Sequence, residues 1–297
     1  MVSRPRMKTG GIIQARHGSV RLPGKVLLPL PYGAKTSVLE HIIRRAGKSR
    51  RLDAVIVATT TRGEDDGIAA LCRKLKVPCF RGDAADVLSR YVRAAGEHGI
   101  DVIVRLTGDN PCLDAGVIDA AVDRHREMKN DYTRTVRYPT GLNVEVVSFE
   151  ALRASARHAV TAFEKEHVTL HLAKNPEKFK NHLMTANASI RDSNLRITLD
   201  TKEDYALLCS VFDQLHAKIP FFGAREILEL FKRKPWLRLI NARVAQKRVF
   251  DTLEEELAEA ARLCGAQDLK KARAYLEKRL CGIGRSSPSL HTRRRKA

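Results

Sequence analysis

Long hydrophobic runs are missing from this sequence. No segment of the 297 residues approaches the roughly 20 consecutive apolar residues that a bilayer-spanning helix needs. The first residues carry charge, but only the short apolar run Ile12-Ile13 follows them, so no signal-peptide core is indicated. We therefore expect no membrane span and a cytoplasmic protein.

Recognisable metal and redox motifs are also missing. None of the six cysteines, at positions 72, 79, 112, 209, 264 and 281, forms a C-x-x-C pair or a zinc-type spacing with histidine, so we expect free thiols in a reducing compartment. Glu166 precedes His167, and His171 follows on the same expected helix, so the zincin order H-E-x-x-H is absent. Substrate contact or ordinary packing remains the interpretation of these residues.

Acidic residues are too few to balance the basic ones. The chain has 54 Lys and Arg against 34 Asp and Glu, a formal charge of +20, which attracts polyanions such as nucleic acid or phosphorylated substrates. Part of the excess lies at the ends, at Arg4, Arg6, Lys8 and in the tail 285–297. That tail has no aromatic residue to stack on bases, so it either solubilises the chain or binds polyanions weakly and non-specifically.

Strand-like and helix-like segments alternate along most of the chain. Short β-branched runs at 11–15, 54–60, 77–80, 101–106 and 195–200 are separated by amphipathic stretches, which predicts an α/β domain with a mostly parallel sheet. Two further strand-like runs flank a turn at 139–141. We expect helices over 151–173, 202–215 and 223–244, and a helical hairpin broken near Gly265 over 251–280.

The loop 16–25 concentrates groups that bind phosphate. It follows a strand and holds two glycines, two arginines, one lysine and one serine, so backbone N–H groups and cations together can cradle a triphosphate. It is not a Walker loop, because five residues separate Gly18 from Gly24 and Val26 replaces the expected Ser or Thr. A basic surface turn is the alternative interpretation.

Two carboxylates, Asp109 and Asp200, each end an expected strand. Ligands of open α/β sheets lie beyond the carboxyl ends of the strands, so the pair could hold Mg²⁺ in one crevice. The alternative is that both cap helices that begin near Asn110 and Thr201. Taken alone, the pattern favours the caps.

Several motifs together resemble a known family. Residues 11–25 resemble the opening motif of the cytidylyltransferases that make CMP-activated acidic sugars, including 3-deoxy-manno-octulosonate and acylneuraminate cytidylyltransferases. The likeness is strongest to the branch of spore-coat polysaccharide biosynthesis proteins. It continues in order through 57–60, 78–82, 86–91, 105–111, 141–146, 166–169 and 199–204, and covers roughly residues 10–247.

The resemblance implies a fold, a reaction and a domain plan. It implies a nucleotide-diphospho-sugar transferase (GT-A, Rossmann-like) three-layer sandwich that transfers CMP from CTP to an acidic or amino sugar with Mg²⁺ and releases pyrophosphate, for surface polysaccharide or glycan biosynthesis. We expect a catalytic domain at 10–247, a helical extension at 248–284 and the basic tail at 285–297. A homodimer is left open.

The resemblance also assigns roles. Arg16, Lys25 and Asp109 are expected to be catalytic, and Asp109 and Asp200 to hold the metal. The expected nucleotide-binding residues are Ala15, Arg16, Gly18, Ser19, Arg21, Lys25, Arg81 and Gly108, and the expected sugar-binding residues are Asn143, Glu145, Glu166 and His167. The chain departs from the family pattern at His17, Val20, Asn110, Cys112 and Asn143, and Asn143 stands where we expect Asp, which bears on the choice of sugar.

Two other functions stay open on the sequence. A glycosyltransferase of the same broad fold would use a finished sugar nucleotide as donor. A basic nucleic-acid-binding protein that has kept an enzyme-like fold would instead show salt-dependent binding.

Overall fold

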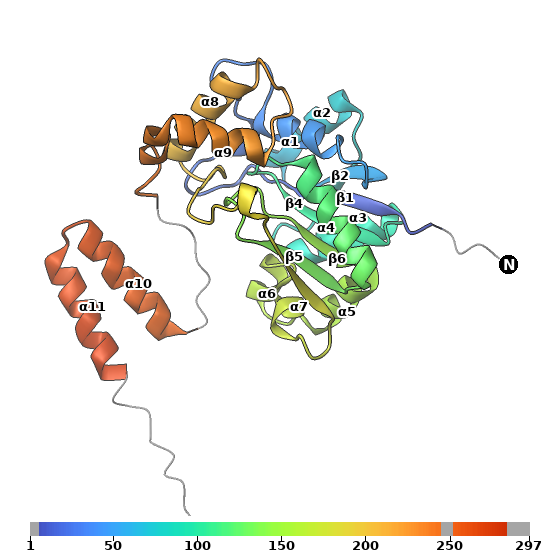
Figure 1. Cartoon of the computed structure of the whole chain (residues 1–297). Coiled ribbons are helices and arrows are strands. Elements are labelled where there is room, and N and C mark those ends of the chain that lie inside the picture. Colours follow the sequence, from blue (N-terminus) through green and yellow to red (C-terminus); the bar gives the residue numbers. More distant parts are fainter. Residues whose placement is uncertain (1–5, 245–251, 284–297) are drawn as a thin grey trace, which may run out of the picture. The chain divides into compact units, whose positions relative to one another are not determined.

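The computed structural model describes residues 6–244 and 252–283. The chain divides into two compact units, with the boundary between Val244 and Ala245. The first unit contains a sheet with helices on both faces, and the second contains a pair of helices (Figure 1).

A seven-stranded mixed sheet forms the centre of the first unit, in the order β3-β2-β1-β4-β6-β5-β7. β6 runs antiparallel to its neighbours β4 and β5, and the other neighbouring pairs are parallel. The mostly parallel sheet predicted from the sequence is thereby confirmed. The strands are β1 (Thr9–Gln14), β2 (Ala54–Thr60), β3 (Cys79–Gly82), β4 (Val102–Thr107), β5 (Tyr132–Val136), β6 (Glu145–Ser148) and β7 (Asn181–Thr185).

Helices cover both faces of this sheet and give three layers. One face packs against α1 (Val38–Ala46), α2 (Asp66–Leu75), α4 (Ala115–Met128), α8 (Lys202–Leu215) and α9 (Ala224–Arg233). The other packs against α3 (Val87–Glu97), α5 (Phe149–His158) and α7 (Leu170–Lys174).

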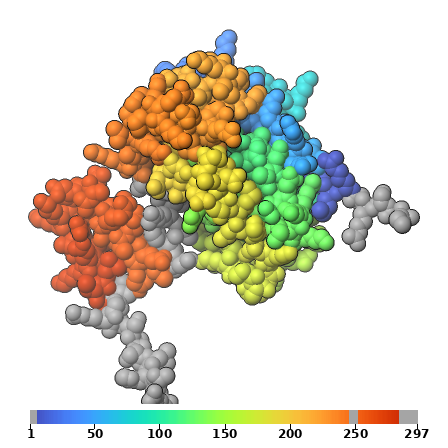
Figure 2. Space-filling view, viewed as in Figure 1, coloured from blue at the N-terminus to red at the C-terminus, as the bar shows by residue number. Residues whose placement is uncertain are grey.

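Alternation along β1 explains why the sheet needs both layers. Successive strand side chains point to opposite faces. Ile13 therefore joins the α1 side and Ile12 the α3 side, and both are fully buried. In the space-filling view, the surface runs without a break from α9 (orange) over the segment after β7 (yellow) to α4 (green) (Figure 2).

The short helices are η1 (Lys25–Leu27), η2 (Gly63–Asp65), α6 (Ala162–Glu166), η3 (Ala188–Ile190) and η4 (Pro235–Leu239).

The single helix predicted over 151–173 is wrong, because the segment forms three separate helices. The structure has α5, α6 and α7 in its place, because Thr161 starts α6 with a capping box and His167 ends it. His167 and His171 therefore belong to different elements and not to one helix face. The helical prediction for 223–244 holds for α9, after which Pro235 begins the short helix η4.

The strand expected over 195–200 does not form. This segment makes one isolated bridge, between Thr140 and Arg196. Its backbone is divided between two partners, since Ile197 N donates to Thr140 O and Leu199 N donates to Asp109 O, both at 2.8 Å. The segment thus ends beside β4 without joining the sheet.

The second unit is the expected helical hairpin. Helices α10 (Leu253–Ala266) and α11 (Lys270–Ile283) lie against each other. The break falls at 267–269, after Gly265, where Asp268 has a left-handed φ of 56°. The basic tail 285–297 and Arg4 lie outside the described residues. Over those described ranges, no helix is both long and apolar enough to cross a bilayer.

Candidate active site

The site is built where two neighbouring strands end. The loop 15–25 follows β1, and Gly108 and Asp109 follow β4, which pairs with β1. Gly108 N donates to Gln14 O at 2.8 Å, and a Cβ on Gly108 would lie only 3.0 Å from that oxygen. A glycine is therefore required for the two strand ends to touch.

The loop 15–25 is closed at its base and anchored at its start. Gly24 has a φ of 68°, which favours glycine, and its N–H donates to His17 O at 3.0 Å. The N–H of His17 donates to Asp65 Oδ1 at 2.6 Å. Between these anchors, Arg16, Gly18 and Arg21 are exposed and Ser19 is half-buried.

Lys25 joins the loop to both predicted metal carboxylates. Its side chain is 11% exposed, and Nζ donates to Asp200 Oδ1 at 2.9 Å, Asp109 Oδ2 at 3.2 Å and Leu199 O at 2.7 Å. Asp200 also pairs with Arg21 at 3.1 Å. We call Lys25, Asp109, Asp200 and Arg21 the Lys25 cluster, and it gathers residues that lie far apart in the sequence.

The capping interpretation of the two aspartates is wrong. The N-cap of α4 is Asp114 and that of α8 is Thr201, so neither Asp109 nor Asp200 caps a helix. Burial alone would raise the pKa of Asp200, but Lys25, together with hydrogen bonds from Lys25 and Arg196, lowers it to about 2. The carboxylate of Asp200 is therefore ionised at neutral pH.

The Lys25 cluster suits a divalent cation. An oxygen of each carboxylate contacts the same ammonium, at 3.2 Å for Asp109 and 2.9 Å for Asp200, so both carboxylates are directed toward one point. Within residues 6–244 and 252–283, no group of three or more His, Cys, Asp or Glu side chains could hold a metal. Two carboxylates fit Mg²⁺ nonetheless, because Mg²⁺ usually completes its shell with water and substrate phosphates.

A second group surrounds Glu145 on β6. Its carboxylate accepts hydrogen bonds from Arg105 Nη1 at 2.7 Å, Tyr132 Oη at 2.7 Å and Thr169 Oγ1 at 3.1 Å. Burial alone would raise the pKa of Glu145, but Arg105 and the Tyr132 hydrogen bond hold it below its ordinary value. We call Glu145, Arg105, Tyr132 and Thr169 the Glu145 cluster.

The other predicted sugar-binding residues are close in sequence to members of this cluster. Glu166 and His167, both half-buried, come just before Thr169, and the His167 ring lies 4.4 Å from that of Phe163. Asn143 is exposed, and its amide donates to Thr135 O at 3.3 Å.

Arg81, a predicted nucleotide contact, is held by the protein itself. Its guanidinium donates to Thr60 O and Arg62 O, each at 2.8 Å, and pairs with Asp66 at 2.7 Å. The side chain therefore braces the end of β2.

Two residues at the site were not predicted from the sequence. Asp65 is fully buried and accepts hydrogen bonds from His17 N and from the Thr60 N–H and hydroxyl, which fixes the loop to β2.

Arg90 is 2% exposed, yet its Nε and Nη1 have no hydrogen-bond partner among the described residues. Burial lowers the pKa of Arg90, and nearby Arg16 adds to the effect. The motif at 86–91 contained the signal for Arg90, because it places an arginine on the apolar face of a helix.

Comparisons with known proteins identify a family that this chain resembles over most of its length. The cytidylyltransferase family model matches residues 11–250. An uncharacterised protein of Methanocaldococcus jannaschii is 38% identical over 81% of this chain and 97% of its own length. The spore coat polysaccharide biosynthesis protein SpsF of Bacillus subtilis is 35% identical over 75% of this chain and 94% of its own. A solved cytidylyltransferase from Leptospira borgpetersenii superposes with a TM-score of 0.72 at 31% identity, covering 82% of this chain and 99% of that one.

Proposed function

This chain belongs to the cytidylyltransferase family, and we propose that it transfers CMP from CTP to a hydroxyl of an acidic or amino sugar and releases pyrophosphate. The family makes it a nucleotidyltransferase. The name of the Bacillus subtilis relative supports a role of the product in polysaccharide biosynthesis.

One observation carries the proposal, namely that Lys25 Nζ contacts both Asp109 and Asp200. A glycine-containing loop with exposed Arg16 and Arg21 is thereby fixed against the carboxylates of Asp109 and Asp200. A triphosphate bound by this loop lies within reach of both carboxylates. That combination serves transfer at a phosphorus atom, where positioning and charge stabilisation supply most of the rate gain.

In the proposed reaction, the sugar hydroxyl attacks the α-phosphorus of CTP. The bond from the α-phosphorus to the bridging oxygen breaks, and pyrophosphate leaves with the electron pair. Arg16, Arg21 and Lys25 neutralise the charge that develops on the phosphate oxygens. The Asp65 anchor of His17 and the Gly24 turn hold the loop in place, so the donors need little reorganisation.

We further propose Mg²⁺ as the cofactor, held by Asp109 and Asp200. Bound there together with phosphate oxygens, it would withdraw charge from the triphosphate. In the ligand-free protein the Lys25 ammonium compensates the same two carboxylates. Lys25 is thus placed to exchange carboxylate contacts for phosphate contacts when nucleotide and metal enter together.

Arg90 supports a nucleotide contact that the sequence did not suggest. A buried guanidinium without hydrogen bonds lowers the stability of the folded protein. Arg45, another buried arginine, has its hydrogen-bond donors satisfied by backbone carbonyls. Arg45 donates to the carbonyls of Leu113 at 2.8 Å and Pro220 at 3.2 Å, and to that of Phe222. We expect the free donors of Arg90 to be satisfied by acceptor atoms of bound CTP.

The test is an assay of pyrophosphate release with Mg²⁺, each of the four nucleoside triphosphates and a panel of acidic and amino sugars. We expect release with CTP and one class of sugar. Release with UTP or GTP instead would identify another sugar-nucleotide pyrophosphorylase. Consumption of a finished sugar nucleotide would identify a glycosyltransferase. Tight nucleic-acid binding at physiological salt with no nucleotide turnover would reject an enzymatic role.

A further inference from the structure

The helical hairpin α10–α11 leaves most of its apolar side chains half-buried or exposed. Among its described side chains, Ala261 alone is buried. Leu253, Leu269 and Tyr275 are 60%, 53% and 58% exposed. Isolated short helices are marginal in water, and most helical stability comes from packing of an apolar face. The hairpin therefore resembles one half of a four-helix bundle, with apolar side chains that a second pair of helices could cover.

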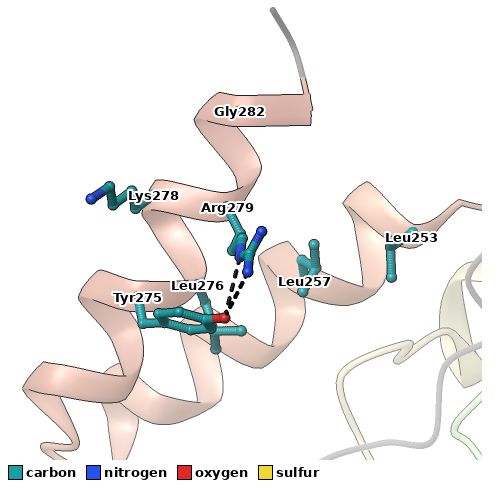
Figure 3. A pocket seen from close by; sticks show the side chains of 7 residues that line it. All are labelled: Leu253, Leu257, Tyr275, Leu276, Lys278, Arg279 and Gly282. Carbon is teal, nitrogen blue, oxygen red and sulfur yellow. Dashed lines mark hydrogen bonds between the residues drawn. The ribbon is translucent and has the colours of Figure 1, made fainter. Parts of the chain in front are cut away.

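The exposed apolar side chains line a groove between the two helices. Leu253 and Leu257 of α10 face Tyr275 and Leu276 of α11 across it (Figure 3). Arg279 lies at the rim and donates to the Tyr275 hydroxyl from Nε at 3.2 Å and Nη2 at 3.1 Å. The groove thus has an apolar floor and a polar edge, the pattern of a protein-protein contact.

The charges of the two helices are segregated. Helix α10 carries four glutamates and one arginine, whereas α11 carries five lysines and arginines and one glutamate. Together with Asp268 in the turn, the hairpin has six acidic and six basic residues, in a chain whose formal charge is +20. The hairpin as a whole is therefore neutral and has no net attraction for a polyanion.

The ion pairs within the hairpin are local. In residues 252–283, the ion pairs join neighbours on one helix or turn, as in Glu259–Arg262 and Arg273–Glu277, and none joins α10 to α11. A two-fold axis places the same surface of two copies face to face. Such an axis can set each acidic α10 against the basic α11 of the other copy.

We propose that the α10–α11 hairpin joins two copies of this chain through an antiparallel four-helix bundle. The grooves close on each other and bury Leu253 and Tyr275 of both copies. The opposite charges of α10 and α11 fix the pairing across the interface, as flanking charges do in other helical bundles. This inference does not depend on the proposed function, because it rests only on residues 252–283.

The experiment is sedimentation equilibrium of the full chain at 150 mM salt, over a range of concentrations. We expect a reversible dimer. The double variant Leu253→Ser with Tyr275→Ser changes side chains that are exposed in the single hairpin, and should weaken the dimer at least tenfold. Its matched control, Ala266→Ser with Gln267→Ser, changes two exposed residues at the turn and should leave the dimer unchanged. A wild-type chain that stays monomeric at 100 µM would overturn the proposal.

Charge reversal gives a second, independent test. One variant replaces Glu254, Glu255 and Glu256 with lysine, and a second replaces Lys270, Lys271 and Lys278 with glutamate. Each alone should be a weaker dimer than the wild type, and an equimolar mixture should form a heterodimer. Two variants that each dimerise as the wild type does, or that fail to pair when mixed while circular dichroism shows an intact hairpin, would reject the charge-matched bundle. A monomer whose variants lower only the melting temperature would show that the hairpin packs on its own chain.

Discussion

The Lys25 cluster and the Glu145 cluster each pair carboxylate with a basic side chain, yet they are built differently. Lys25 is shared between two carboxylates that come from separate segments, and Asp109 is 29% exposed. Glu145 is 16% exposed and is held by three side-chain donors from three different segments. Contacts of the first kind can be exchanged for a ligand, whereas those of the second kind hold the framework.

This difference suggests that the Lys25 cluster takes part in the chemistry and that the Glu145 cluster positions other residues. Exchangeable ion pairs at the Lys25 cluster can give way to a triphosphate and a metal ion without leaving charges unpaired. The acceptors of Glu145 are already used by Arg105, Tyr132 and Thr169. We therefore expect Glu145 to shape the neighbouring sugar site, and substitutions in the two clusters should affect different measured quantities.

The largest effect is expected for Asp109→Asn. The amide keeps the shape but loses the charge that would hold Mg²⁺, and metal stabilisation of charge is worth several kcal/mol, so kcat/KM for CTP should fall by more than about 10³-fold. Steady-state kinetics at saturating Mg²⁺ measure this. The control is Asp101→Asn, at the opposite end of β4, where the carboxylate accepts from the Lys8 backbone at 2.7 Å and should not affect turnover. Near-normal turnover by a folded Asp109→Asn enzyme would refute the metal assignment.

A somewhat smaller effect is expected for Lys25→Ala. Removal of one preorganised donor to a developing oxyanion typically costs about 10²–10³ in rate, and we expect a loss in kcat of that order. Lys35→Ala is the control, because Lys35 is an exposed lysine in the same β1–α1 connection. A loss below about fivefold on that scale would argue against phosphate contact by Lys25.

Arg90→Met should have effects of opposite sign on stability and on binding. Removal of a buried, unsatisfied guanidinium should raise the melting temperature of the ligand-free protein. A hydrogen bond to a charged group is worth about 1.5–3 kcal/mol, so calorimetric CTP affinity should fall about tenfold or more. Arg45→Met is the matched control, since its guanidinium is hydrogen-bonded to carbonyls and its loss should lower the melting temperature. Unchanged CTP affinity in Arg90→Met would remove Arg90 from the nucleotide site.

The sequence was sufficient for β1 to β4 and for the position of the loop 15–25, because both depend on local pattern, but it missed β7 and predicted a strand over 195–200 that does not form. β-Branched runs mark the strands, and glycines with cations mark the loop. It could not show which carboxylates meet, since Asp109 and Asp200 are brought together by Lys25 and by the Leu199–Asp109 backbone contact. Helix capping explains another failure, because the capping box at Thr161 divides a segment whose composition is helical throughout.

The smallest effect on CTP turnover, and a clear effect on stability, is expected for Glu145→Gln. The change leaves Arg105 without its counter-charge, so the free energy of unfolding should drop by about 1–3 kcal/mol, while kcat/KM for CTP should change less than about fivefold. The native pKa of Glu145 is below its ordinary value, so its contribution is present above the unfolded pKa and is lost as pH falls through the native one. Denaturant unfolding between pH 7 and pH 3 should therefore show the two proteins converging in stability toward acid. Equal stability at pH 7 would refute the structural role of Glu145. A loss of CTP turnover as large as that of Lys25→Ala would show that Glu145 takes part in the chemistry and that the two clusters are not distinct.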